Sequence, residues 1–543
     1  MRVIKLISIW LFLLLQLSAL AQVAPNKYVI YFTDKDQTPY SIDAPEEFLT
    51  QRALDRRMNA GISIDSTDLP VDPVYLDSIE TTGAEVIYKS NWFNFAVVIA
   101  NEVDILTIED FGFVSGVSKR NNKVSYADLK NKFAEEMNSI KSTTATYEEV
   151  QEQINVDNLH NLGYRGAGVR IAVIDAGFTG FDVAEEFQHL YTDGRLIATR
   201  NVATNSSIYS SHTHGTSVSS IMCGDLGNTY KGVATDAEYI LIRSETGATE
   251  YIEEEFAWVA AAEYADSLGA DIINSSLGYT TFDWSDQNHT YDDLDGNTAI
   301  ISRAAGMAFN KGILVFTSAG NLGNDDWYYV SVPADQPDIL TIGSVDIEGN
   351  KSGFSSVGLP EQTYKPDVSA CGDNAPFLSA GEVYNGSGTS FSSPLVAGAA
   401  ACLWQTNPEK TNAEIAAAIR ASASLYPDGN QQIGYGIPDF ALAMSILNDS
   451  SNIPSDPDRA EFLSAYRIGN QLSLQVYSPV ESAVEIRIYD LNGKSIYAQN
   501  VILQPMTVNP IRLNHSFVQS ENQIILVNLN GKLFNETKKV SLF

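Results

Sequence analysis

Between residue 155 and about residue 447, short apolar segments alternate with alanine-rich segments of helical character. The sequence predicts strands near 169–174, 239–242, 271–274, 313–317 and 339–342, and helices near 253–268 and 298–311. Such alternation is typical of βαβ units built around a parallel sheet. Because ligand sites in these sheets lie at the carboxyl ends of the strands, functional residues are expected directly after the strands.

A smaller domain is predicted ahead of this region. Strands are expected at 27–32, 85–88, 94–100 and 114–117, with helices at 72–81 and 104–110. The resulting order β-α-β-β-α-β predicts a small ferredoxin-like α+β domain. A polar stretch rich in Lys and Glu follows at about 119–152 and is interpreted as a linker or cleavage region.

The last 85 or so residues have a different pattern. After a loop with two prolines at 453–458, apolar and polar residues alternate at 472–477, 484–489 and 523–529. This pattern predicts a small β-sandwich.

The N-terminus has the features of a secretory signal peptide. Arg2 and Lys5 precede an apolar stretch at 6–17, and Ala19-Leu20-Ala21 fits a small-x-small cleavage site. A membrane anchor is the alternative, but the apolar stretch is short for a span. The expected organisation is therefore a signal peptide at 1–21, a first domain with linker at 22–150, the α/β domain at 151–449 and the β-sandwich at 456–543, with no membrane span after signal cleavage.

Charge and cysteine content exclude some classes of function. The chain carries 34 Lys and Arg against 67 Asp and Glu, a net charge of -33, so it lacks the basic surface that nucleic-acid binding requires. The chain has three cysteines, Cys223, Cys371 and Cys402. A set this small, with an odd number of members, is not a disulfide framework. A cysteine protease would need a thiol beside a histidine, and none of the three has a histidine next to it in the sequence.

Three short segments carry the chemistry. An apolar strand delivers Asp175 to its carboxyl end, where a buried carboxylate can orient a histidine, although an Asp there also forms turns. His214 opens an HGT triplet and can act as a general base, while the pair His212-x-His214 leaves a metal site as the alternative. Ser390 follows Gly386 and Gly388 and opens a small-residue helix, with Pro394 expected in its first turn. Its hydroxyl is a candidate nucleophile and its N–H a candidate oxyanion donor; a simple helix cap is the alternative.

Together these segments resemble the subtilisin-like (subtilase) family of serine proteases. Asp in D-x-G, His in HGT and Ser in GTSxSxP occur in the order Asp–His–Ser, which differs from the orders of chymotrypsin-like enzymes and α/β-hydrolases. The resemblance covers about 155–447. It implies a subtilisin-like three-layer parallel sheet and a secreted serine endopeptidase that uses Asp175, His214 and Ser390, requires no cofactor and acts on proteins or peptides.

Further segments extend this resemblance. TSAGN at 317–321 resembles the oxyanion segment and implies that Asn321 is the side-chain donor. NSSLG at 274–278 resembles the strand that binds the substrate backbone, which implies substrate contacts by Ser275, Ser276, Leu277 and Gly278. The first domain resembles the subtilase propeptide, which implies an intramolecular inhibitor.

Two regions leave alternatives open. Residues 279–297 are interpreted as an insertion whose Asp292, Asp293 and Asp295 are candidate calcium ligands, with a solvated acidic loop as the alternative. YDLNGK at 489–494 and NGKLFNETKKV at 530–540 resemble a type IX secretion sorting domain. That resemblance implies the type IX secretion machinery as a partner and export through the periplasm and outer membrane. A binding β-sandwich is the alternative.

Two other classes of protein are alternatives to an active subtilase. One is a non-catalytic surface protein on the same scaffold, which would tend to lose the triad. The other is a lipase-like hydrolase, which would need G-x-S-x-G, whereas residue 392 is Ser.

Overall fold

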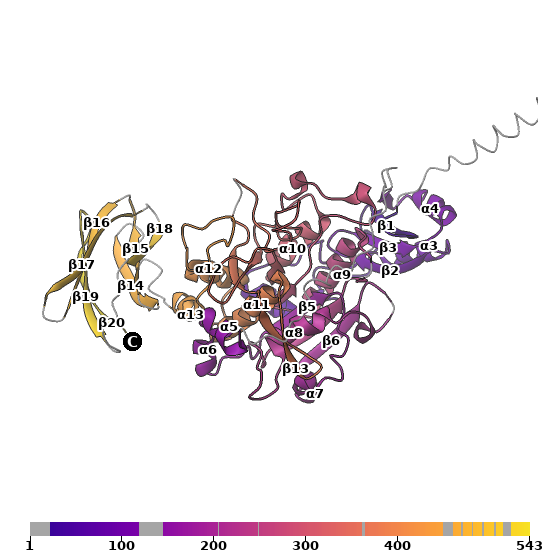
Figure 1. Cartoon of the computed structure of the whole chain (residues 1–543). Helices are drawn as coiled ribbons and strands as arrows, with labels where there is room; N and C mark the ends of the chain where they lie inside the picture. The colour runs from indigo at the N-terminus through magenta and orange to yellow at the C-terminus, as the bar shows by residue number, and fades with distance from the viewer. Residues whose placement is uncertain are drawn as a thin grey trace, which may run out of the picture. The chain divides into compact units, whose positions relative to one another are not determined.

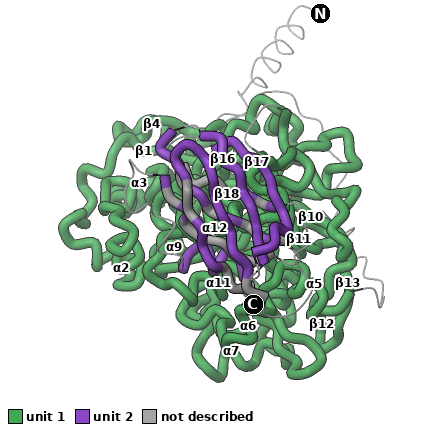
Figure 2. Tube along the Cα trace, turned by 90° about the vertical axis from the view of Figure 1, so that its left-hand side faces the viewer, with its two compact units in different colours: residues 1–440 green, residues 441–543 purple. Residues whose placement is uncertain are grey.

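The structure is a computed structural model in which residues 22–118, 145–204, 206–247, 249–360, 364–448, 460–468, 471–480, 482–490, 493–503, 507–513 and 523–542 are described. The predicted signal peptide at 1–21 and most of the predicted cleavage region lie outside these residues. The chain forms two compact units, Met1–Phe440 and Ala441–Phe543 (Figure 2). None of the helices in the described ranges has the length and apolar character needed to cross a bilayer.

The first part of unit 1 is a four-stranded antiparallel sheet with helices (Figure 1). Its elements are β1 (Lys27–Phe32), η1 (Pro45–Glu47), α2 (Gln51–Asn59), α3 (Pro73–Glu80), β2 (Glu85–Ser90), β3 (Phe95–Ile99), α4 (Glu102–Glu109) and β4 (Val114–Val117). The strand order β2-β3-β1-β4 is that of a ferredoxin-like domain, as predicted. Helix α2, between β1 and α3, was not predicted.

The second part of unit 1 is built on a seven-stranded parallel sheet in the order β11-β10-β9-β8-β5-β7-β6, which confirms the predicted fold class. The strands are β5 (Arg170–Asp175), β6 (Leu196–Asn201), β7 (Glu238–Arg243), β8 (Ile272–Ser275), β9 (Leu314–Ser318), β10 (Leu340–Val345) and β11 (Val368–Cys371). From β5 the sheet extends on one side through β7 to β6, and on the other side through β8, β9 and β10 to β11. The change of direction between β5 and β8 marks the sheet edge where a ligand crevice is expected.

Helices cover both faces of this sheet (Figure 1). The larger ones are α8 (His214–Cys223), α9 (Glu253–Ser267), α10 (Ile300–Asn310), α11 (Thr389–Thr406) and α12 (Asn412–Ser422). Shorter elements of this part are α5 (Tyr147–Gln153), α6 (Asp157–Asn161), η2 (Glu185–Phe187), α7 (Gln188–Thr192), η3 (Ile208–Ser210), η4 (Ser285–Gln287), η5 (Tyr291–Asp293), and the hairpin β12 (Ala375–Ser379) and β13 (Glu382–Gly386). Helix α13 (Phe440–Asn448) starts at the last residue of unit 1, and the rest of it belongs to unit 2. Ala172 and Ile174 of β5 share a core with α9 and α10. Since side chains alternate along a strand, Asp175 points to the opposite face, where α8 and α11 pack.

One hydrophobic core joins the two parts of unit 1. Val29, Phe95 and Val97 from the antiparallel sheet belong to the same cluster as Trp258 of α9. The other face of the antiparallel sheet packs against α3 and α4 in a separate core. The first domain therefore uses its own helices on one face and the helices of the larger domain on the other.

Unit 2 is a pair of antiparallel sheets, as the alternating pattern predicted. One sheet contains β14 (Glu461–Ile468), β15 (Gln471–Ser478) and β18 (Thr507–Leu513); the other contains β17 (Ser495–Leu503), β16 (Ser482–Tyr489), β19 (Gln523–Gly531) and β20 (Asn535–Leu542). Leu474, Ile486 and Val527 belong to a core to which both sheets contribute.

Candidate active site

Asp175 and His214 meet at the carboxyl edge of the parallel sheet. Asp175 is the last residue of β5 and His214 the first residue of α8, and both are fully buried. His214 Nδ1 lies 2.8 Å from Asp175 Oδ1, which also accepts the Ala176 N–H at 2.7 Å. This contact fixes the orientation of the imidazole ring.

Two glycines make this approach feasible. A methyl group at Gly215 would lie 2.6 Å from Gly177 O and 2.9 Å from Asp175 Cβ. Gly177 has a φ of 150°, and a methyl group there would lie 1.8 Å from Ser211 Oγ. The glycines of D-x-G and HGT are therefore required because the two segments touch.

Ser390 lies in the first turn of α11, with 2% of its surface exposed. Its Oγ lies 3.5 Å from Ser276 O, and its own carbonyl accepts the Ser276 Oγ–H at 3.1 Å. Pro394 lies in the second turn of α11, not in the first as predicted, because the helix begins at Thr389. A proline four residues after Ser390 has no N–H to donate to the Ser390 carbonyl, which leaves that oxygen for Ser276.

Asn321 lies beside the start of α11. Its Oδ1 accepts the Thr389 N–H at 2.8 Å and the Thr389 Oγ–H at 3.0 Å. The Asn321 side chain is thereby oriented next to the residue that precedes Ser390. Thr389, which the sequence reasoning did not single out, fixes this arrangement; its place in the GTS string was the available signal.

The four residues after Asn274 have different surroundings. Ser275 Oγ accepts the Trp258 Nε1–H at 2.9 Å, so its side chain packs toward α9. Ser276 contacts Ser390, Leu277 is buried in the core shared with α9, and Gly278 is exposed. Of the predicted substrate residues, Ser276 therefore lies next to Ser390, and Gly278 is open to solvent.

The electrostatics of the site depend on burial. Burial raises the pKa of the Asp175 carboxyl, and the contacts with His214 and the Ala176 N–H oppose that increase. The nearby carboxylate of Glu245 adds to the increase. Stabilising the ionised carboxylate is therefore a role of His214.

The cysteines do not form a second nucleophilic site. All three are free and buried, and burial raises the pKa of each thiol. None of the three cysteines has a histidine next to it in the sequence, but in the structure His160 Nε2 lies 3.9 Å from Cys402 Sγ. Burial lowers the pKa of His160 to about 4, so this pair does not favour a thiolate.

The acidic insertion does not gather its carboxylates. Asp293 caps η5 by accepting the Thr290 N–H at 2.7 Å, and Asp295 accepts the Asn297 and Thr298 N–H groups at 2.8 and 2.7 Å. Among the residues that the structure describes, no three His, Cys, Asp or Glu side chains form a candidate metal-binding group. Asp292 therefore belongs to no such group either. The same finding gives the His212-x-His214 pair no third ligand of these types, and His212 Nδ1 instead accepts the His214 N–H at 3.0 Å.

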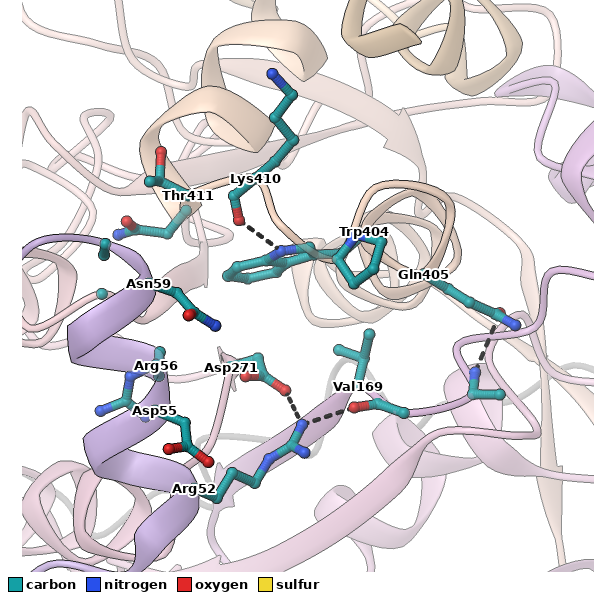
Figure 3. A pocket seen from close by; sticks show the side chains of 16 residues that line it. Arg52, Asp55, Arg56, Asn59, Val169, Asp271, Trp404, Gln405, Lys410 and Thr411 are labelled. Atoms are coloured by element: carbon teal, nitrogen blue, oxygen red, sulfur yellow. Dashed lines mark hydrogen bonds and ion pairs between the residues drawn. The ribbon is translucent and has the colours of Figure 1, made fainter.

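A cavity of about 340 Å³ lies away from these residues, between α2 and the larger domain (Figure 3). Arg52 and Asn59 line it from α2, and Asp271, Trp404 and Thr411 line it from the larger domain. Arg52 bonds Gly168 O at 2.6 Å and forms an ion pair with Asp271 across this seam. The cavity therefore belongs to the contact between the two domains.

Comparison with known proteins gives two family matches. The model described as "Subtilase family" matches residues 166–436, and the model described as "Peptidase S8 propeptide domain, Bacteroidota" matches residues 27–138. The two matches coincide with the two parts of unit 1.

Individual relatives agree with the first match. Subtilisin NAT of Bacillus subtilis subsp. natto is 30% identical over 278 residues, which is 50% of this chain and 65% of that protein. Subtilisin of Bacillus pumilus is 29% identical over 278 residues, 50% of this chain and 90% of that protein. The chain thus spans less than two thirds of the first relative and most of the second.

Two solved structures also match. The prenylagaramide maturation protease PagA has 24% identity and a TM-score of 0.44, covering 54% of this chain and 98% of that chain. MycP1 from Mycobacterium smegmatis has 21% identity and a TM-score of 0.43, covering 60% and 89%.

Proposed function

Because this chain carries a subtilisin-like S8 peptidase domain preceded by a Bacteroidota S8 propeptide domain, we propose that it is a secreted serine endopeptidase made as a zymogen. The observation that carries the proposal is the buried 2.8 Å contact between His214 Nδ1 and Asp175 Oδ1 at the sheet edge. Ser390, in the first turn of α11 beside the same edge, supplies the hydroxyl. We assign these three residues as the catalytic triad.

The proposed reaction is acyl transfer to Ser390 and then to water. His214 Nε2 takes the proton of Ser390 Oγ as that oxygen attacks the carbonyl carbon of the scissile peptide bond. Asp175 holds the imidazole tautomer and stabilises the imidazolium that forms. His214 then gives the proton to the leaving amine, and water hydrolyses the acyl-enzyme with His214 again acting as base.

Two donors are proposed for the oxyanion. The Ser390 N–H lies in the first turn of α11, where backbone N–H groups have no partner within the helix. Asn321 anchors its Oδ1 on Thr389, next to Ser390 in the chain, and its side-chain amide is the proposed second donor. Donors fixed in advance stabilise developing negative charge with little reorganisation.

The propeptide domain is proposed to act as an intramolecular inhibitor. Its sheet shares a hydrophobic core with α9, and its α2 forms buried ion pairs with the peptidase domain. A shared core and buried ion pairs support a segment that stays attached until the chain is processed. Proteins or peptides are the proposed substrates, and no cofactor takes part in the proposed steps.

Unit 2 is proposed to be a type IX sorting domain that directs export through the periplasm and outer membrane. The support is the sequence YDLNGK at 489–494, at the end of β16, and the strand-rich character of the unit. Deleting residues 456–543 tests the proposal: retention in the periplasm agrees with sorting, whereas secretion with lost substrate binding indicates a binding module.

Labelling with an active-site serine phosphonate tests the catalytic proposal. Processed wild-type protein should carry the label on Ser390 by peptide mass mapping, and Ser390→Ala should carry none. The alanine variant should also lose about 10⁶-fold in kcat. Folded, processed protein that takes no label would instead be a non-catalytic protein on a subtilase scaffold.

A further inference from the structure

Helix α8, which starts with the proposed base His214, begins without the usual side-chain cap. Its N-cap residue, Thr213, has φ and ψ of -90° and -9°, and among the described residues its side chain makes no cap hydrogen bond. The first N–H groups of a helix have no partner within the helix, so other groups must accept from them. At α8 one of these groups belongs to His212, whose Nδ1 accepts the His214 N–H at 3.0 Å.

The backbone of His212 is anchored to the loop that follows β5. The His212 carbonyl accepts the Thr179 N–H at 3.0 Å. On the other side of His214 in the chain, the Gly215 N–H donates to Gly177 O at 3.0 Å. The ring of His212 therefore closes a turn between two backbone anchors, and that turn contains the proposed base.

The hydrogen bond from the His214 N–H requires a neutral His212 ring. An imidazole nitrogen accepts only when it carries no proton, so the accepting Nδ1 places the ring proton on Nε2. The His212 side chain is half-buried, and its ring centroid lies 6.4 Å from that of His214. Protonation of Nδ1 would place one N–H against another and break the bond. It would also place a positive charge near the imidazolium that His214 becomes in the proposed reaction.

The segments around the His212 ring carry few other titratable groups. The loop at 176–181 has no titratable side chain. The segment around Gly247 packs against the ring, since a methyl group at Gly247 would lie 3.5 Å from His212 Cδ2. The titratable residues of these segments and of the proposed triad are Glu245 and Glu250 on either side of Gly247, and Asp175 and His214. All of these except His214 are carboxylic acids, so no lysine or arginine of these segments opposes protonation of the ring.

We propose that His212 is a positioning residue for the catalytic base: its neutral ring holds the first residue of α8 in place, and its protonation releases that residue. This inference rests on the proposed endopeptidase function. The fall in activity at acid pH should then depend on two histidines. His214 must be neutral to take the Ser390 proton, and His212 must be neutral to accept the His214 N–H.

Two substitutions at His212 separate the acceptor from the ring. His212→Asn keeps an acceptor that does not titrate, because an asparagine side chain readily bonds the backbone N–H two residues on. His212→Phe keeps a ring and removes the acceptor. The full chain is expressed and allowed to process, and kcat and KM are measured on one peptide substrate from about pH 5 to about pH 9.

At about pH 8, His212→Asn should keep kcat within about threefold of the wild type. His212→Phe should lower kcat about tenfold and leave KM within about threefold, since a lost helix cap shifts an equilibrium by about that factor. Below about pH 6, log kcat of the wild type should fall with a slope steeper than about 1 against pH, because two histidines take up protons. In His212→Asn that slope should be about 1, because His214 alone remains.

Two control variants accompany these substitutions. Thr213→Ala alters the N-cap residue itself, whose side chain does not cap α8 in the described structure. His189→Asn removes another half-buried histidine, which lies in α7. Both should retain the kcat and the acid slope of the wild type.

A wild-type slope of about 1, or equal slopes in the wild type and His212→Asn, overturns the inference. A His212→Phe variant whose KM rises while kcat is unchanged also overturns it, because His212 is then a substrate contact. If His212→Phe does not fold, the slopes of the wild type and His212→Asn decide.

The outcomes also separate this inference from the proposed function. Protein that takes the phosphonate on Ser390 but shows the same kcat and slope in the wild type and both His212 variants keeps the function and overturns the role of His212. Folded, processed protein that takes no label and does not cleave the peptide overturns both.

Discussion

Replacing Asp266 by Asn should loosen the attachment of α2 to the peptidase domain. Asp266, in α9, pairs through Oδ1 with Arg56 and through Oδ2 with Arg57 at 2.7 Å, and both arginines belong to α2. Arg57 also pairs with Asp68 at 2.8 Å. Only 2% of the Asp266 surface and 1% of the Arg57 surface is exposed.

The magnitude follows from this burial. Asn keeps the shape of Asp266 but removes the charge, so two buried guanidinium groups lose their shared anion. Removing one partner from a buried ion pair costs about 3–5 kcal/mol, because the charge left behind is uncompensated. Since about 1.4 kcal/mol corresponds to tenfold, local opening of α2 should become at least about 100-fold more frequent.

Hydrogen exchange of the α2 amides measures this opening. The Ser390→Ala background keeps the chain uncut, and the amides of β5 report on whether the peptidase domain stays intact. Asp55→Asn is the matched control, because Asp55 lies in α2 at the same seam but is exposed. Its effect should stay below about threefold, as for surface charges. If Asp266→Asn changes α2 exchange no more than Asp55→Asn does, the buried charges do not hold this helix in place.

Three further predictions concern the site, the pH dependence and calcium. Asp175→Asn should lower kcat on a peptide substrate by about 10⁴, because the imidazole loses its tautomer partner; a loss below tenfold would contradict the triad. Glu263 of α9 accepts the Asn91 and Trp92 N–H groups of the propeptide domain at 2.6 and 3.1 Å. Burial raises the pKa of the Glu263 carboxyl to about 7, so the attached state binds a proton that the detached state releases. Attachment should therefore strengthen as the pH falls from about 7.5 toward 5 and weaken as the pH rises through 7. Exchange of the β2–β3 amides, corrected for intrinsic rates, measures this, and Glu263→Gln should abolish the dependence. EDTA should leave the Tm unchanged, because Asp293 and Asp295 already accept backbone N–H groups; a drop of several degrees would favour the calcium interpretation of residues 279–297.

The fold followed from the sequence wherever local pattern and packing agree. A strand buried on both faces requires an uninterrupted apolar segment, and the predicted apolar run meets this requirement. The β5 strand accordingly ends at Asp175, directly after that run. The motif spacing likewise indicated the segments that carry Asp175, His214 and Ser390. Such strings are specific because their glycines allow close backbone contacts.

Other features depend on contacts that are distant in the sequence. Ser275 was predicted to bind substrate, but whether its side chain faces Trp258 or the cleft depends on which face of β8 packs on α9. Helix α2 lacks a clear apolar stripe, since it attaches through arginines, and a search for hydrophobic periodicity therefore misses it.

The shared core of unit 1 predicts that the propeptide domain becomes less stable once it is cleaved off. Its sheet has its own helices on one face only, and Val29, Phe95 and Val97 of the other face depend on the peptidase domain for their burial. Once detached, the segment would present a bare apolar sheet to water and lose part of the burial that keeps it folded. A weakened fold is readily digested, and under the proposed function the freed domain is itself a protease. Under this proposal activation should be irreversible, because the detached propeptide domain is degraded and cannot bind again.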